Sequence, residues 1–340
     1  MEWLINYFPN YSILIEFGSI NDGRKKQEVN NLIELENTRC LFCGKVYKKG
    51  KKKDVAHAIS ECLGNKKLIN YRECYECNHL FGEILENHLG KFIMPYRFVC
   101  RIFGKRNKNI IRDNPKDKDM VYENYIFEQS NTQIFEDSNF DVSTLIIENT
   151  LSKRVQISED GMMLDIPRQI YDPRMVYASF LKMAYVLLPP EEISKYSEVI
   201  KMLYFFVKAK SDNKYTEKVD AFFNFLPSIG VEILDNNYSS EGVNVCLLKL
   251  MDDNLNSPAI LFAIQMKMYT IVVPIFDDDD IRFKKNRKLK FEGTDNVRML
   301  DFTKFEENFK CYLQAEKKEL NEKVIKYIEQ LLRKNKHLKQ

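Results

Sequence analysis

The middle of the chain carries hydrophobic patterns that change from helical to strand-like spacing. Asp172-Pro173 is a typical helix start, because Asp can cap the helix and Pro fits its first position. Apolar residues then recur at helical spacing from Met175 to Leu187. Pro189-Pro190 ends this helix and begins a second one that continues to Phe206. Residues 230–276 alternate as β-strands do, so the order predicts two helices followed by an antiparallel sheet.

The same patterns predict how the chain divides. Residues 121–170 hold short alternating stretches, and the pattern at 303–337 predicts a long C-terminal helix. A polar, proline-containing segment predicts a linker at 111–125. With 340 residues, 44% of them hydrophobic, the chain is long enough for two domains. We predict the α+β fold class, with an N-terminal domain at 1–110 and a C-terminal α+β domain at 126–340.

Two cysteine pairs stand out in the N-terminal part. Cys40-Leu41-Phe42-Cys43-Gly44 is a zinc-knuckle sequence, and Cys74-Tyr75-Glu76-Cys77 supplies a second pair of the same spacing. Each tight turn can point both thiolates at one ion, which suits tetrahedral zinc. Eight cysteines in the whole chain are too few for a disulfide scaffold. We therefore predict structural Zn²⁺ held by Cys40, Cys43, Cys74 and Cys77, in a reducing cytoplasmic compartment.

The thirty residues between the cysteine pairs contain a histidine motif. It reads Val55-Ala56-His57-Ala58-Ile59-Ser60-Glu61-Cys62-Leu63-Gly64-Asn65, and Asn78 follows the last cysteine at the start of a helix predicted over 78–92. Together with the cysteines, these residues resemble the zinc-containing branch of the HNH endonucleases, which have a His-Me finger, or ββα-metal, module. The resemblance covers about residues 39–98.

The resemblance implies a role for each matching residue. In that family a β-hairpin carries the general base and the following helix carries a metal ligand. His57 matches the base, and Asn70, with Asn65 as the alternative, matches the asparagine that steadies the hairpin loop. Asn78 matches a ligand of the catalytic Mg²⁺ or Mn²⁺. The family usually has Asp, Glu or His before the base, where this chain has Ala56. The candidates for the missing ligand are Asp54 and Glu86.

These residue types suit phosphodiester hydrolysis. The reaction needs a water molecule deprotonated beside phosphorus, and a neutral imidazole can take that proton near pH 7. A hard divalent ion can stabilise the departing oxygen. We therefore expect a metal-dependent endonuclease that hydrolyses DNA, with RNA as a substrate that the sequence does not exclude.

Positive charge is concentrated in the part that carries the motif. The net charge is +3, but residues 1–120 hold 22 Lys and Arg against 15 Asp and Glu, which gives +7 there and −4 in the remainder. A basic surface is what a phosphate backbone requires. The lysines expected to contact nucleic acid are Lys51, Lys52, Lys53, Lys66 and Lys67, and the alternative is a solvated hairpin tip.

The second domain carries no recognisable catalytic motif or nucleotide fingerprint. By family analogy, an HNH module fused to such a domain resembles bacterial or phage-related defence and restriction proteins. The analogy implies a small-molecule or protein activator at the C-terminal domain and a homo-oligomer. No run of 18–20 apolar residues is present and the first residues lack a basic region, so we expect neither a membrane span nor a secretory signal.

Two other function classes stay open. The first is a non-catalytic, zinc-stabilised nucleic-acid-binding protein in which Ala56 records a lost activity. The second is a protein-interaction module whose zinc compensates for a small core.

Elsewhere, the acidic run Asp277–Asp280 lies just before a basic run, which predicts a charged, solvated surface loop.

Overall fold

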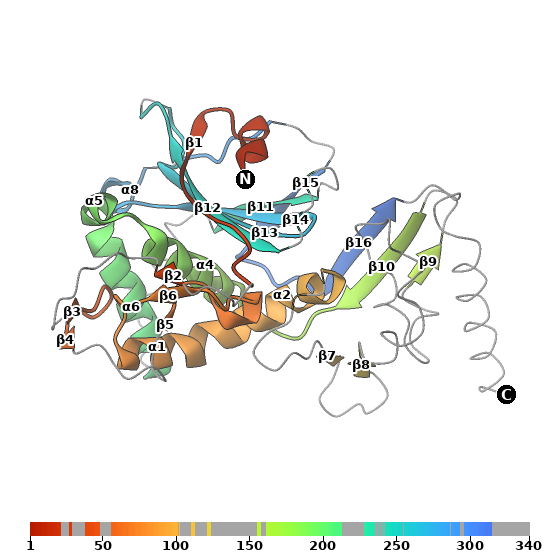
Figure 1. Cartoon of the computed structure of the whole chain (residues 1–340), viewed down its shortest axis with the longest axis horizontal. Coiled ribbons are helices and arrows are strands. Elements are labelled where there is room, and N and C mark those ends of the chain that lie inside the picture. Colours follow the sequence, from red (N-terminus) through yellow and green to blue (C-terminus); the bar gives the residue numbers. More distant parts are fainter. Residues whose placement is uncertain are drawn as a thin grey trace. The chain divides into compact units, whose positions relative to one another are not determined.

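The largest element of the fold is a six-stranded sheet in the order β1-β12-β13-β14-β11-β15, with every neighbouring pair antiparallel (Figure 1). Residues from the start of the chain pair here with residues from its second half, because β1 lies against β12. Every residue of β13 and β14 is buried, so both faces of the sheet are covered. The strands are β1 (Tyr11–Phe17), β11 (Ile229–Leu234), β12 (Val243–Leu250), β13 (Ile260–Met266), β14 (Tyr269–Ile275) and β15 (Val297–Asp301).

The computed structural model describes residues 1–21, 27–28, 38–47, 56–100, 102, 110–112, 121–123, 155–157, 161–212, 228–234, 238, 240, 242–253, 255–285, 287–292 and 296–314. The chain forms two units, one of Met1–Gly90 with Tyr171–Phe305 and one of Lys91–Ile170 with Glu306–Gln340. The mixture of helices and mainly antiparallel sheet agrees with the predicted fold class. Most of the predicted linker lies outside the described residues, and the predicted domain boundaries stay a prediction.

Helix α4 (Pro173–Leu187) covers one face of the sheet. It begins as predicted, because the Asp172 side chain accepts a hydrogen bond from the backbone N–H of Arg174 at 3.0 Å and Pro173 opens the helix. Every residue from Met175 to Leu187 is buried. The Tyr177 hydroxyl donates to the backbone oxygen of Pro274 in β14 at 3.1 Å. The predicted second helix is confirmed as α5 (Pro190–Ile193), the 3-10 turn η7 (Ser194–Tyr196) and α6 (Ser197–Ser211).

The opposite face of the sheet is covered by the N-terminus. The 3-10 helix η1 (Glu2–Asn6) contributes Leu4, and Phe8 follows it into a cluster with sheet residues such as Val231 and Leu248. Trp3 stacks on Tyr238, with ring centroids 5.0 Å apart. The first residues of the chain therefore complete a core made by its second half.

The second unit contains a three-stranded sheet in the order β16-β10-β9. Strand β16 (Asn308–Gln314) pairs antiparallel with β10 (Gly161–Pro167), which also pairs with β9 (Val155–Ile157). The predicted C-terminal helix over 303–337 is therefore wrong at β16. Phe309, Cys311 and Leu313 alternate there with polar residues, and this period of two suits a strand that has a partner. Residues 315–337 lie outside the described part. A short pair, β7 (Ile110–Arg112) and β8 (Val121–Glu123), completes the described strands of this unit.

The acidic run at Asp277–Asp280 forms a helix terminus. Asp277 and Asp280 make a reciprocal capping box on α8 (Asp278–Arg282). Asp278 accepts from the backbone N–H of Val199 at 2.9 Å and so caps α6, while Asp280 is buried against Arg287. The prediction of a solvated loop is wrong, because these carboxylates satisfy backbone N–H groups.

Within the described residues, every helix is too short or too polar to cross a membrane.

Candidate functional site

The two cysteine pairs are held by a hairpin and by the start of a helix. Strands β3 (Thr38–Arg39) and β4 (Val46–Tyr47) pair around the first turn, where Gly44 has φ of 72°. The backbone N–H of Cys40 donates to Lys45 at 2.8 Å and closes this turn. Cys74 is the N-cap of α1 (Tyr75–Phe81), which places Cys77 in its first turn. Both turns therefore direct their thiols to one point.

The four sulfur atoms lie at metal-binding distance. The ligand atoms of Cys40, Cys43, Cys74 and Cys77 are all within 4.8 Å of one another, and Cys43 Sγ is 3.7 Å from Cys74 Sγ. Tetrahedral zinc with Zn–S bonds of about 2.3 Å separates its sulfur ligands by about 3.8 Å. All four are free cysteines, and Cys43 alone among them is half-buried. The cluster predicted from the sequence is confirmed, and its geometry fits zinc.

Electrostatics favour a cation at this cluster. Hydrogen bonds from the Cys74 and Cys77 side chains lower the pKa of Cys40. Hydrogen bonds with the Cys40 and Cys74 side chains, together with burial, raise the pKa of Cys77. Buried thiols thus compete for one negative charge, and a divalent ion would allow the others to ionise as well.

His57 lies on a short hairpin that leads into the cysteine-bearing helix. Strand β5 (Ala56–His57) pairs antiparallel with β6 (Leu68–Asn70), with His57 opposite Ile69, and α1 follows five residues after β6. Strand β2 (Gln27–Glu28) adds to β6 in parallel. The order is strand, strand, helix, with the histidine on the first strand. The His57 side chain is 25% exposed, so solvent reaches it.

Asn65 holds the loop of this hairpin together. Its Nδ2 donates to the backbone oxygens of Ile59 at 2.7 Å and Leu68 at 2.9 Å. Its Oδ1 accepts from the backbone N–H groups of Lys67 and Leu68 at 3.0 and 2.9 Å. Asn70 instead spans the turn into α1, donating to Glu73 and accepting from the backbone N–H of Arg72. Asn65, which the sequence analysis gave as the alternative to Asn70, therefore makes the contacts that steady the hairpin loop.

We expect Asn65→Ala to open this loop. The substitution leaves two N–H groups and two carbonyl oxygens in a buried site without their partner, at a cost of roughly 1–3 kcal/mol for each group that water cannot reach. Amide hydrogen exchange at Lys67 and Leu68 should accelerate more than exchange in the six-stranded sheet. Asn87→Ala, at an exposed asparagine, is the control and should leave exchange at both amides unchanged. Equal amide exchange at Lys67 and Leu68 in the two variants would contradict the role of Asn65 in steadying the loop.

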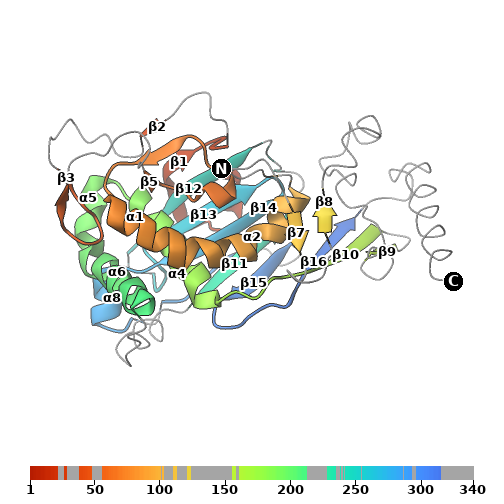
Figure 2. The same ribbon diagram turned by 90° about the horizontal axis from the view of Figure 1, so that it is seen from below.

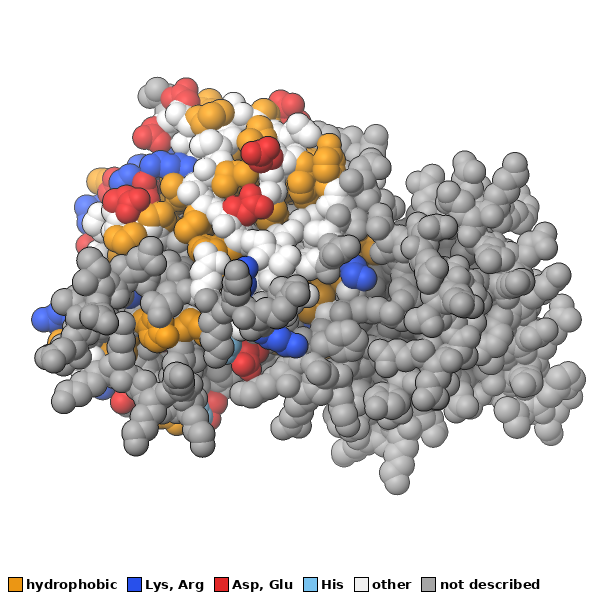
Figure 3. Space-filling model, viewed as in Figure 1, with side chains coloured by type: hydrophobic (Ala, Val, Ile, Leu, Met, Phe, Trp, Pro, Cys, Tyr) orange, Lys and Arg blue, Asp and Glu red, His pale blue; other side chains and the backbone are white. Residues whose placement is uncertain are grey.

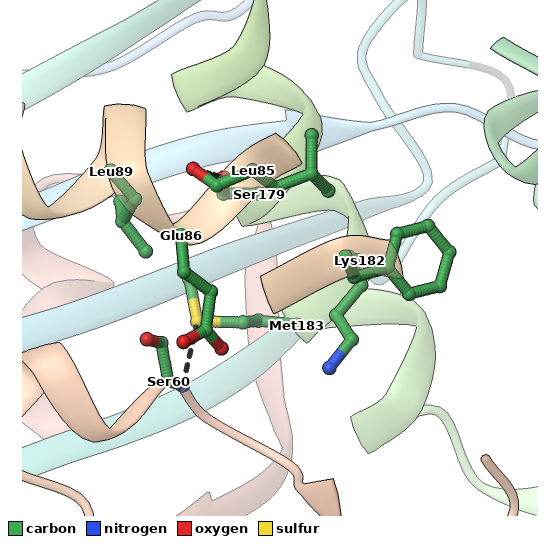
Figure 4. Close-up of a pocket in the computed structure, with 8 residues that line it drawn as sticks. Ser60, Leu85, Glu86, Leu89, Ser179, Lys182 and Met183 are labelled. Carbon is green, nitrogen blue, oxygen red and sulfur yellow. Dashed lines mark hydrogen bonds between the residues drawn. The ribbon is translucent and has the colours of Figure 1, made fainter. Parts of the chain in front are cut away.

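Among the described residues, no contact brings together Asn78 and Glu86, two of the predicted ligands of a catalytic ion. Asn78 is half-buried in α1, and its backbone N–H donates to Cys74 at 3.0 Å. Glu86 ends a π-helical turn (Gly82–Glu86) and lies in a small pocket beside Ser60 (Figure 4). Asn78 and His57 do not line this pocket. Asp54, with Lys51, Lys52 and Lys53, lies outside the described residues, so these assignments stay predictions.

Ala56 occupies the position where the family carries a metal ligand. Its side chain is 1% exposed and has no donor atom. It faces Asn70 across the hairpin, and Asn70 is also buried. Any divalent ion near His57 must therefore take its oxygen ligands from other positions.

Two buried charges fasten the turn before α1 to helix α4. The Arg72 guanidinium donates to the backbone oxygens of Val186 and Leu188 at 3.1 and 3.0 Å. Burial lowers the pKa of Arg72 to about 10. Lys182 Nζ lies 2.9 Å from Glu73 Oε2, and burial raises the pKa of Glu73 while Lys182 opposes that rise. Sequence reasoning missed these residues, since nothing local marks them as buried. Figures 1 and 2 show α4 between the sheet and α1.

The other two described histidines, His79 and His88, differ in exposure and in their contacts. His79 is exposed and pairs with Glu83 at 3.2 Å. The His88 side chain is half-buried, and its Nδ1 accepts from the backbone N–H of Asp172 at 2.9 Å.

The described basic residues near the hairpin differ in exposure. Lys66 is exposed, whereas Lys67 is half-buried and its Nζ reaches the backbone oxygen of Gly18 at 3.5 Å. On the described part of the face in Figure 3, lysines and arginines lie among acidic and hydrophobic side chains. The predicted contacts of these lysines with nucleic acid therefore stay predictions.

No family model, no curated protein and no solved structure matches this chain. The function is therefore inferred from the site's own residues and geometry.

Proposed function

We propose that the chain is a metal-dependent endonuclease of the HNH type, which hydrolyses phosphodiester bonds in DNA with His57 as the general base. One observation carries the proposal. A partly exposed histidine lies on the first strand of a hairpin whose second strand leads into a helix, and the four-cysteine cluster holds the start of that helix. Strand, strand and helix in this order are the arrangement that the sequence resemblance implies.

Each residue contributes in a way that its environment supports. His57 is accessible to water and takes the proton of the attacking molecule. Asn65 keeps the hairpin loop closed around it. Zinc at the cysteines would hold the β3–β4 turn against the start of α1. A bound Mg²⁺ or Mn²⁺ would neutralise charge on the leaving oxygen, and the half-exposed Asn78 offers one oxygen ligand.

The connection through α4 suggests how the nuclease is controlled. Arg72 and Glu73 fasten the hairpin and helix to α4, and α4 packs on the six-stranded sheet through residues such as Tyr177. In this proposal the C-terminal α+β part recognises an activator, either a small molecule or a protein. Binding of this activator then allows a homo-oligomer of the chain to cleave nucleic acid, as expected of a cytoplasmic defence or restriction protein.

A second candidate function is a non-catalytic, zinc-stabilised nucleic-acid-binding protein. The buried Ala56 favours it, because that position offers no ligand to a catalytic ion. This candidate predicts DNA binding that weakens with salt and does not depend on added Mg²⁺.

Incubation with supercoiled plasmid distinguishes the two candidates. The nuclease is expected to nick or linearise plasmid in Mg²⁺ or Mn²⁺ and to stop when EDTA removes the ion. A parallel RNA substrate reports which nucleic acid is cleaved. Salt-sensitive plasmid binding with no cleavage in either ion, at any oligomeric state of the protein, would favour the second candidate.

A further inference from the structure

The ring of His57 lies between a carboxylate and an amide. Its Nε2 atom is 3.1 Å from Oε1 of Glu61, and its Nδ1 atom is 3.5 Å from Nδ2 of Asn65. The Glu61 side chain is 33% exposed, so this contact is only partly screened by water. Both nitrogens of the ring thus face a polar group within the hairpin.

The carboxylate decides which nitrogen carries the proton. Both amide hydrogens of Asn65 point at the backbone oxygens of Ile59 and Leu68, and its contact with Nδ1 is at the outer limit of a hydrogen bond. An ionised carboxylate has no proton to donate, so it can only accept hydrogen bonds. In neutral His57, Nε2 therefore donates its proton to Glu61 and Nδ1 keeps the lone pair.

The backbone fixes Glu61 where it meets the ring. Glu61 begins the 3-10 turn η3 (Glu61–Leu63), which Ser60 caps by accepting from the backbone N–H of Cys62 at 3.3 Å. The turn ends at Gly64, whose φ of 81° favours glycine and whose N–H donates to Glu61 at 2.9 Å. Both ends of the turn that presents the carboxylate are therefore fixed.

We propose that Glu61 is the positioning residue for His57. Its carboxylate holds the Nε2 proton and so presents Nδ1 as the atom that accepts a proton from water. When Nδ1 takes that proton, the Nε2 proton stays on the ring, and the carboxylate stabilises the imidazolium that forms. The inference rests on the proposed nuclease function, and the pairing itself can be measured without it.

Glu61→Gln tests the role of the charge, because it keeps the side-chain length. In an NMR titration of the full chain, the midpoint of the His57 Cε1–H signal is expected to move to lower pH, since the imidazolium loses its charge partner. Plasmid cleavage is expected to fall by roughly tenfold or more, with the acid limb of its pH profile moving in the same direction. Glu61→Asp, which retains the charge, is expected to recover part of both effects.

Glu83→Gln is the matched control. It removes the carboxylate that pairs with exposed His79 at 3.2 Å, with the same four-residue spacing. It should leave both the His57 midpoint and cleavage unchanged. An unmoved His57 midpoint in Glu61→Gln overturns the inference, and so does an equal loss of cleavage in Glu83→Gln. A moved midpoint in a protein that never cleaves nucleic acid supports the pairing and contradicts the proposed function instead.

Discussion

Cys77→Ser is expected to lose the bound zinc and unfold the hairpin and helix around it. Binding at structural zinc sites is worth about 10–16 kcal/mol at neutral pH, and that free energy stabilises the folded state directly. Here the ion would join a hairpin turn at Cys40 to a helix start at Cys74. Elemental analysis should find about one zinc per wild-type chain and close to none in the variant. Amide exchange in α1 should accelerate strongly.

Cys62→Ser is the control for this prediction. Cys62 is a half-buried free cysteine in the loop between β5 and β6, but it lies outside the four-sulfur cluster and accepts a hydrogen bond from Ser60. This variant should keep its zinc and its protection from exchange. Zinc retained in Cys77→Ser, or lost equally from both variants, would contradict the assignment of the cluster.

Lys182→Met is expected to destabilise the fold by about 3–5 kcal/mol, because it leaves the charge of Glu73 buried without its cation. The Glu73 side chain is fully buried and that of Lys182 is 8% exposed, so water can replace little of the lost interaction. Chemical denaturation monitored by circular dichroism should show a lower midpoint. The double variant Lys182→Met with Glu73→Gln removes both charges and should recover most of the loss.

Lys195→Met serves as the comparison for the buried pair. Lys195 pairs with Glu192 at 3.1 Å, close to the 2.9 Å of the buried pair, but its side chain is 60% exposed. Exposed ion pairs contribute about 0–1 kcal/mol, so this variant should unfold almost as the wild type does. Equal losses in Lys182→Met and Lys195→Met would mean that Glu73 does not depend on its buried partner.

Local sequence signals predicted those parts of the fold that local chemistry determines. The helix after Asp172 follows from an N-cap and a proline, and the cysteine cluster follows from two turns of fixed spacing. Both patterns act within a few residues, so they can be read without knowledge of the rest of the chain.

Features that depend on distant partners were missed or misassigned. Strand β16 lies in a longer segment whose overall pattern predicts a helix, and it forms a strand because β10 pairs with it. The sequence predicts a solvated Asp278 because its partner is distant in the chain. This partner is the backbone N–H of Val199 at the start of α6, 79 residues away. The choice between Asn65 and Asn70 depended on which carbonyls each amide meets, and spacing alone does not report that.

The most direct test of the account compares His57→Ala with His79→Ala in plasmid cleavage at matched zinc content. Both variants remove one histidine from the same module, but only His57 lies on the hairpin beside Glu61, whereas His79 is exposed on α1. The account predicts that His57→Ala lowers the cleavage rate by about 10²–10⁴-fold while His79→Ala cleaves as the wild type does. Cleavage by His57→Ala at the wild-type rate would contradict it.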